Sequence, residues 1–337
     1  MSATIRGAAD EPAVAPTPRF RAVRFFYLNN SIGAVVTAAV LVALVAAFWA
    51  GPRFYSVDGI SNVTSSIALP LLAGSFASLG LLSGVVDLSV GPMIGVSAAL
   101  FSVLGTHHVN VWIAGLVAVV ACVLAASINA VAVVIFGADS IAATVGMLTI
   151  LTGVTFALIG NNPPSFIVDA LFNFSLASVG PFAALFLVAA GCAVALAVVV
   201  LFTRVGRHLK AAGGDPAAAM RAGIRVSRLR FGAFLMGGVG AGLTGIFYIG
   251  QNGGGAIDIG TNLTFEIFAA LMIGGFSVVR GGVGNPIGAI FGLLIIGAVG
   301  VLLDISQIDS HYLNVVLGVV LIIAVLVDRL RGGERFE

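Results

Sequence analysis

The chain has 337 residues, of which 59% are hydrophobic and 9% are charged. Soluble domains carry about 25% charged residues, so this composition excludes an ordinary soluble domain. The formal net charge of +2 indicates no partner by itself. Long apolar stretches instead predict an all-α polytopic membrane protein, because helices satisfy their own backbone hydrogen bonds within a lipid bilayer.

Apolar runs divide the chain into candidate spans. A bilayer core needs about 20 apolar residues per helix. Runs of that order lie at residues 32–50, 60–82, 87–105, 111–136, 141–160, 180–203, 231–251, 263–279, 283–303 and 312–328. We therefore expect about ten transmembrane helices in one domain of residues 29–330, between a disordered polar tail of residues 1–28 and a short tail of residues 331–337.

Some of these runs carry prolines, which indicate broken or re-entrant helices. We expect breaks at Pro70, Pro92 and Pro286. Residues 90–95 and 283–288 are distantly alike, and each segment is followed by a helix of small residues. This similarity favours an internal duplication, a common feature of transporters.

Basic residues are concentrated in one polar interruption, residues 204–230, which holds seven of the sixteen Lys and Arg residues. Two further basic groups lie near the ends of the chain, and Arg53 and Arg280 are isolated. Because Lys and Arg are retained in the cytoplasm, we expect residues 204–230 and both termini to be cytoplasmic. The interruption has no aromatic residue and no recognition module, so we expect no nucleic-acid partner.

A short capped helix is predicted within this basic segment. Asp215 can accept hydrogen bonds from the free N–H groups of a helix start, and Pro216 suits the first helical position. Residues 217–221 favour helix, and Gly223 favours its end. Such a helix is too small to hold a core of its own. We therefore expect it to dock on a partner protein outside the membrane.

No residue pattern predicts catalysis. A phosphate-binding loop needs a Lys directly before Ser or Thr, whereas Lys210 is the only lysine and precedes Ala211. The four histidines and the scattered carboxylates show no metal-ligand spacing. We expect a chain that has no catalytic residue and binds neither a cofactor nor a metal.

Polar residues in apolar surroundings are candidates for a transport pathway or gate, because their place in a membrane is costly. The candidates are Asp87, Ser89, Asn129, Thr144, Thr149 and Glu266. Structural roles stay open for all of them. Asp87 can serve as a cap or turn former, Glu266 can face the outer water, and the Asn and Thr side chains can bond between helices.

Four segments resemble the permease subunits of bacterial ABC importers for monosaccharides, the ribose and xylose permease type, which are related to branched-chain amino acid permeases. They are Ser-Gly-Val-Val-Asp-Leu-Ser-Val-Gly at residues 83–91, Ser-Ile-Ala-Ala-Thr-Val-Gly-Met at residues 140–147, the loop of residues 206–224 with its Gly-Gly-Asp-Pro-Ala-Ala-Ala, and the stretch from Glu266 to Gly282 with two Gly-Gly pairs. The resemblance extends over nearly all of residues 60–330.

The resemblance implies a non-catalytic permease subunit in the bacterial inner membrane. Two copies would stand on two ATPase subunits, which hold ATP and Mg, and a periplasmic binding protein would deliver a sugar or polyol. The short helix would dock on the ATPase through Gly213, Gly214, Asp215, Pro216, Ala217, Arg221 and Gly223. Asp-Leu-Ser-Val-Gly at residues 87–91 favours the sugar branch of the family.

Three positions depart from the family pattern: Val85 where Gly is usual, Asp215 where Asn is common, and Pro286 in a turn that normally lacks proline. They leave the particular sugar unassigned. A secondary carrier or channel that works without ATP is the alternative class, and it leaves the short helix unexplained. An intramembrane enzyme would need a nucleophile with a base, or metal ligands, inside the spans, and the sequence shows no such set.

Overall fold

The computed structural model describes Phe48 and residues 51–161, 163–254, 259–308 and 311–333. Its elements are the 3₁₀-helix η1 (Gly51–Arg53), α3 (Val57–Ser83), α4 (Val90–Thr106), α5 (Val111–Ala130), the π-helix η2 (Val131–Ile135), α6 (Ser140–Ile159), α7 (Asp169–Leu176), the strands β1 (Ser178–Val179) and β2 (Phe182–Ala183), α8 (Ala184–Phe202), α9 (Arg204–Gly214), α10 (Pro216–Arg221), α11 (Val226–Asn252), α12 (Ile259–Ile273), α13 (Pro286–Ile305) and α14 (His311–Gly333). The two strands pair in an antiparallel hairpin. The tail of residues 1–28 and, apart from Phe48, the expected span of residues 32–50 lie outside the described residues.

Six helices in the described part of the chain are long and apolar enough to cross a membrane. They are α3, α5 continued by η2, α6, α8, α11 and α13. Shorter apolar segments lie in α4, α12 and α14. An all-α, multi-pass membrane protein is therefore confirmed, while the number of about ten spans stays a prediction.

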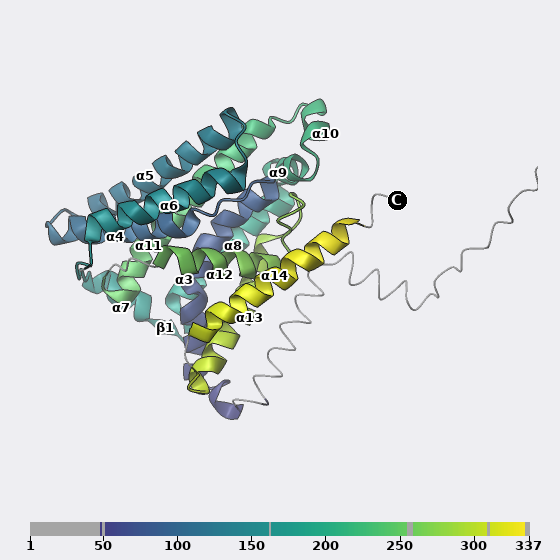
Figure 1. Cartoon of the computed structure of the whole chain (residues 1–337). Helices are drawn as coiled ribbons and strands as arrows, with labels where there is room; N and C mark the ends of the chain where they lie inside the picture. The colour runs from purple at the N-terminus through teal and green to yellow at the C-terminus, as the bar shows by residue number, and fades with distance from the viewer. Residues whose placement is uncertain (1–47, 49–50, 162, 255–258, 309–310, 334–337) are drawn as a thin grey trace, which may run out of the picture.

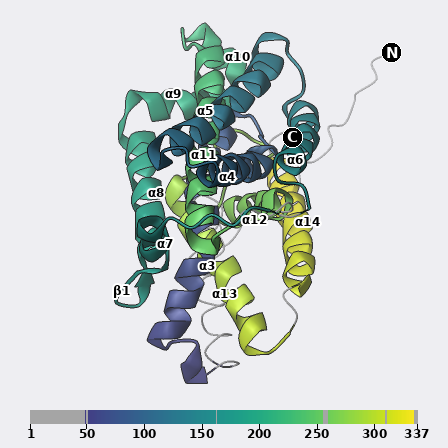
Figure 2. The same cartoon turned by 90° about the vertical axis from the view of Figure 1, so that its left-hand side faces the viewer.

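Two long helices, α3 and α11, form the centre of the bundle (Figures 1 and 2). α3 packs against α8, α11 and α13, and α11 also packs against α4 and α5. Residues 67–83 of α3 are buried without exception. Small side chains allow this close approach: a methyl group on Gly242 of α11 would lie 2.8 Å from the Cα atom of Val119 in α5.

Irregular backbone separates two pairs of helices. Residues 84–89 form the first break, between α3 and α4, and residues 274–285 form the second break, between α12 and α13. Gly84 at φ 80° and Gly275 at φ 91° adopt the left-handed conformation that favours glycine. In both breaks the glycine and the residue after it bond back to carbonyls of the last helical turn. The two breaks therefore begin with the same helix cap.

Prolines lie at the end of each break. Pro286 is the first residue of α13, and Pro92 lies in the first turn of α4. The break expected at Pro70 is absent, because α3 continues through this residue. A proline removes one helical hydrogen bond, but the buried packing on all sides of Pro70 keeps α3 continuous. The prediction of a break at Pro70 is wrong.

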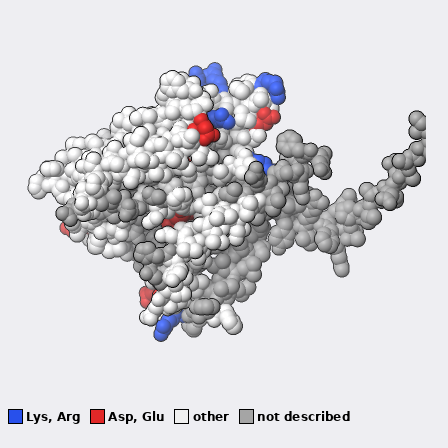
Figure 3. Space-filling view, viewed as in Figure 1, with Lys and Arg blue, Asp and Glu red and all other residues white. Residues whose placement is uncertain are grey.

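Charge is distributed unevenly along the bundle. Lys and Arg side chains gather at the end that carries α9 and α10 (Figure 3). Arg53 ends η1 at the opposite end, where α3 begins. The helix α7 and the β1–β2 hairpin also lie toward that opposite end (Figure 1). This asymmetry agrees with the uneven charge distribution expected of a multi-pass membrane protein.

Candidate functional site

The basic segment folds into α9 and α10, which meet at Asp215. Thr203 caps α9, and its hydroxyl oxygen accepts a hydrogen bond from the Gly206 N–H at 3.3 Å. The carboxylate of Asp215 caps α10 and accepts from the Ala218 N–H at 2.9 Å. Pro216 occupies the first turn of α10. The predicted cap and helix start are confirmed.

α10 ends where the sequence predicts, and one of its faces is buried. α10 ends at Arg221, and Gly223 then adopts a φ of 80°, so the predicted helix end is also confirmed. Ala219 is buried in a small apolar cluster with Ala212 of α9 and Val226 of α11. These contacts fix α10 on its two neighbours.

The opposite face of α10 is exposed. It carries Ala217, Met220 and Arg221, and the Met220 side chain is 58% exposed. α10 projects from the end of the bundle at which the basic residues gather (Figures 1 and 3). An apolar and basic surface of this kind, outside the membrane helices, is available to a soluble protein.

The end of α9 meets both helix breaks through backbone contacts. We call this meeting point of Gly84, Gly213, Gly281 and Gly282 the glycine junction. A methyl group on Gly281 would lie 2.7 Å from the Gly213 carbonyl oxygen and 2.5 Å from Gly84 Cα, and one on Gly282 would lie 2.7 Å from the Gly214 nitrogen. Only glycine permits backbones to approach this closely. The end of α9 therefore rests directly on the first and the second break.

A basic side chain connects α11 to the same place. Arg230 donates a hydrogen bond from Nε to the Ser83 carbonyl oxygen at 3.2 Å. The last carbonyls of a helix have no partner within the helix, and the guanidinium supplies one at the end of α3. Sequence reasoning gave Arg230 no role of its own. The only signal for it is its membership of the basic segment.

A buried polar cluster, formed by Asp87, Ser89 and Asn129, lies on the first break and α5. One carboxylate oxygen of Asp87 accepts hydrogen bonds from the Ser89 N–H at 3.0 Å and from the Ser89 hydroxyl at 2.5 Å. The Asn129 amide donates to the Ser89 hydroxyl oxygen at 2.8 Å and to the same Asp87 oxygen at 3.4 Å. All three side chains are buried. The structure thus brings together three of the predicted pathway residues.

Hydroxyl groups from α6 and α12 hold the backbone of the first break. Thr144 accepts a hydrogen bond from the Leu88 N–H at 3.2 Å, and Ser140 accepts one from the Val86 N–H at 3.4 Å. Thr264 of α12 donates to the Leu88 carbonyl oxygen at 3.4 Å. A buried backbone outside a helix needs such partners. Thr144 was a predicted candidate, whereas the sequence shows no spacing that would single out Ser140 or Thr264.

Thr149 and Glu266 share no hydrogen bond with the polar cluster. Thr149 is exposed on α6 and donates to the Val145 carbonyl oxygen of its own helix at 3.2 Å. Glu266 is partly exposed on α12, and its carboxylate has no hydrogen-bond or ion-pair partner within the residues that the structure describes. Their assignment to a pathway stays a prediction.

Possible metal ligands and thiols are further reactive groups among the described residues. No group of three His, Cys, Asp or Glu side chains is placed to hold a metal ion within the described ranges. Cys122 is buried and Cys192 is half-buried, and both are free thiols. The distinctive features of the described chain are therefore the exposed face of α10, the glycine junction and the polar cluster.

Comparison with known proteins finds related chains over most of the sequence. The family model described as "Branched-chain amino acid transport system / permease component" matches residues 59–325. The ribose import permease protein RbsC of Escherichia coli strain K12 is 28% identical over 306 residues, which are 87% of this chain and 92% of the relative. RbsC of Bacillus subtilis strain 168 is 26% identical over 312 residues, 91% of this chain and 95% of the relative.

A second kind of importer protein is similar to the same extent. The autoinducer 2 import system permease protein LsrC of Escherichia coli O9:H4 is 28% identical over 316 residues, 92% of this chain and 90% of the relative. No solved structure gives a significant match. The resemblance to sugar import permeases, drawn from four sequence segments, is confirmed by these relatives.

Proposed function

Because the chain belongs to the family of branched-chain amino acid transport system permease components, we propose that it is the membrane subunit of a bacterial ABC importer for a monosaccharide or a related polyol. The relatives named as ribose import permeases support this solute class. In this proposal the chain is not catalytic. A separate ATPase subunit binds ATP and Mg, and a periplasmic binding protein delivers the solute.

The assembly follows from the same proposal. Two copies of the chain form the pathway in the inner membrane. The termini, α9 and α10 lie in the cytoplasm, where positive charge is retained. The end that carries α7 and the β1–β2 hairpin then faces the periplasm and the binding protein (Figure 1).

The observation that carries the proposal is the construction of α10. Six residues form a helix capped at both ends, which stands on α9 and α11 and exposes Met220 and Arg221. Met and Arg are enriched in protein interfaces. A helix this short contributes little core, so its exposed face is best explained as a docking surface for the ATPase.

The route from this surface into the membrane passes through α9. α9 and α10 share Asp215, so a displacement of α10 moves the end of α9. Gly213 then displaces the backbone at Gly84 and Gly281. The first break continues from Gly84 to the polar cluster, whose hydrogen bonds can rearrange between two states of the pathway. ATP binding and release on the partner would drive this movement.

The test is a purification of the tagged chain from its native membrane in mild detergent. We expect a soluble ATPase to co-purify with the wild-type chain, and its amount to fall at least tenfold when Met220→Asp and Arg221→Glu are combined. Arg228→Glu is the matched control, because Arg228 is also exposed but lies in α11. If no ATPase is retained in several detergents and uptake follows an ion gradient, the chain is a secondary carrier instead.

A further inference from the structure

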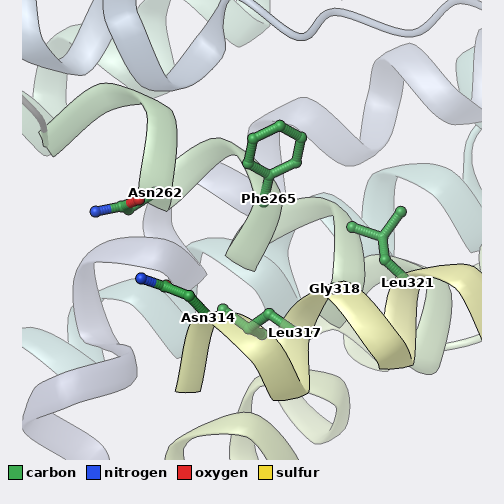
Figure 4. A pocket seen from close by; sticks show the side chains of 6 residues that line it. All are labelled: Asn262, Phe265, Asn314, Leu317, Gly318 and Leu321. Carbon is green, nitrogen blue, oxygen red and sulfur yellow. The ribbon is translucent and has the colours of Figure 1, made fainter. Parts of the chain in front are cut away.

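A cleft of about 310 Å³ lies between α12 and α14. Its lining consists of Asn262, Phe265, Asn314, Leu317, Gly318 and Leu321 (Figure 4). The amides of Asn262 and Asn314 come from different helices and lie together at one end, while Phe265 and Leu321 lie toward the other (Figure 4). Small-molecule sites range from about 300 to 1,000 Å³. The cleft is therefore large enough for one small solute.

The helix α12 carries two polar side chains on one face, because Asn262 and Glu266 are four residues apart. Asn262 is exposed on this helix, and Glu266 follows one turn later, partly exposed and without a partner among the described residues. Polar and ionisable groups in membrane helices typically face a water-filled cavity. This face of α12 is therefore suited to water and solute.

The position of the cleft agrees with entry from the side opposite α10. Asn262 and Asn314 lie in the first turns of α12 and α14. α14 begins just after α13 ends, at the end of the bundle away from α9 and α10 (Figures 1 and 2). In the proposed importer this is the side on which a binding protein releases its cargo. A solute entering from this side would meet the two amides first.

The lining residues define a chemical class of ligand. Each amide can donate and accept hydrogen bonds, which matches a solute with several hydroxyl groups. The Phe265 ring offers an apolar surface for carbon-bound hydrogens. No Lys, Arg, Asp or Glu is among the described residues that line the cleft, so none of them compensates a charge on the solute.

We propose that the α12–α14 cleft holds the transported solute during its passage, and that this solute is a neutral polyhydroxylated compound of monosaccharide size with one apolar face. The inference rests on the proposed function, since it assigns a site to the solute of that importer. It identifies Asn262, Phe265 and Asn314 as specificity-determining residues.

Uptake in native cells tests the site. The radiolabelled probes are D-ribose, D-xylose, D-galactose and ribitol, and deletion of the gene identifies the probe that depends on this chain. We expect Asn262→Leu and Asn314→Leu each to reduce uptake of that probe about tenfold, because each removes hydrogen bonds to it. Asn252→Leu is the matched control, because the Asn252 amide bonds to the Tyr248 carbonyl of its own helix and lies outside the cleft.

The outcomes separate the two proposals. If no probe depends on the gene, the proposed solute class fails. If one probe does depend on it and the double variant of Asn262 and Asn314 still transports it at the wild-type rate, the cleft is not the site and the proposed function stands. Retention of the ATPase in the pull-down shows whether a variant that loses uptake is still assembled.

A second measurement does not depend on the polar residues. A methyl group on Gly318 would have no atom within 4 Å, so Gly318→Cys fits the cleft. In a Cys192→Ser background, with Cys122 only 1% exposed, a membrane-impermeant maleimide should label this cysteine, and the transported probe should slow the labelling severalfold. Ile322→Cys, exposed on α14 outside the cleft, should show no protection. Absence of labelling or of protection at position 318 would mean that lipid or a second copy covers the cleft, and would overturn the proposal.

Discussion

The glycine junction allows a sharp test, the substitution Gly213→Ala. The added methyl group would overlap the Leu82 carbonyl oxygen and the Gly282 nitrogen, and would lie 2.9 Å from the Gly281 carbonyl carbon. All three atoms belong to the backbone, so no side-chain rotation relieves the overlap. Overpacking costs about 1–3 kcal/mol, and replacing Gly by Ala in a helix returns up to about 1 kcal/mol.

Because the methyl group would overlap backbone atoms on two sides, the upper half of the overpacking cost applies, about 2–3 kcal/mol. After the gain in helix propensity is subtracted, the free energy of unfolding should fall by about 1–2 kcal/mol. For a chain of 337 residues the melting temperature should fall by about 1–3 °C, measured by thermal unfolding of the purified permease in detergent. Gly214→Ala is the matched control. Its methyl group would meet only the Gly281 carbonyl oxygen, at 4.0 Å, so its melting temperature should be unchanged or slightly raised. Equal melting temperatures for the two variants would refute the argument for a tight backbone junction.

Three further substitutions test the neighbouring features. Asp215→Ala removes the cap of α10 at a cost of about 0.5–2 kcal/mol, enough to fray so short a helix, so ATPase retention in the pull-down should fall while membrane insertion, followed by membrane fractionation, is unchanged. Asn129→Leu leaves the Ser89 hydroxyl and the Asp87 carboxylate with fewer partners and should destabilise the chain by about 1–3 kcal/mol; an unchanged thermal unfolding curve would contradict the polar cluster. Thr149→Val removes only a bond within α6 at an exposed position, so the same unfolding assay should show a change of no more than about 0.5 kcal/mol.

Much of the fold could be predicted because a membrane-spanning helix appears in the sequence as a run of about 20 apolar residues. Every described helix that is long and apolar enough to cross a membrane coincides with an apolar run recognised in the sequence. The extent of a helix near a proline could not be predicted in the same way. Pro70 and Pro286 are the same residue type, but the burial that keeps α3 continuous at Pro70 depends on neighbours distant in sequence.

In the candidate site too, local features could be predicted from the sequence, whereas contacts between distant segments could not. The cap at Asp215 and the helix end at Gly223 are local features, and the sequence predicted both. The contact of Gly213 with Gly84 and Gly281 joins segments far apart in the chain. Glycine-rich pairs indicate close backbone approach, but no single sequence says which pairs meet.

The position of Phe265 in the cleft also could not be predicted from the sequence. A phenylalanine in an apolar run is most simply a packing residue, and only the neighbouring α14 gives it a cleft to line. Glu266 attracted attention because a carboxylate in a membrane helix is rare, whereas the amide of Asn262, one turn earlier on α12, gave no such signal.

The two breaks begin with the same type of helix cap, but the segments after the caps differ. After Gly84 the chain builds the polar cluster, whereas after Gly275 it supplies Gly281 and Gly282 to the end of α9. The end of α9 therefore touches both breaks at once. In the proposed importer, a displacement of α9 would therefore act on both breaks at the same time.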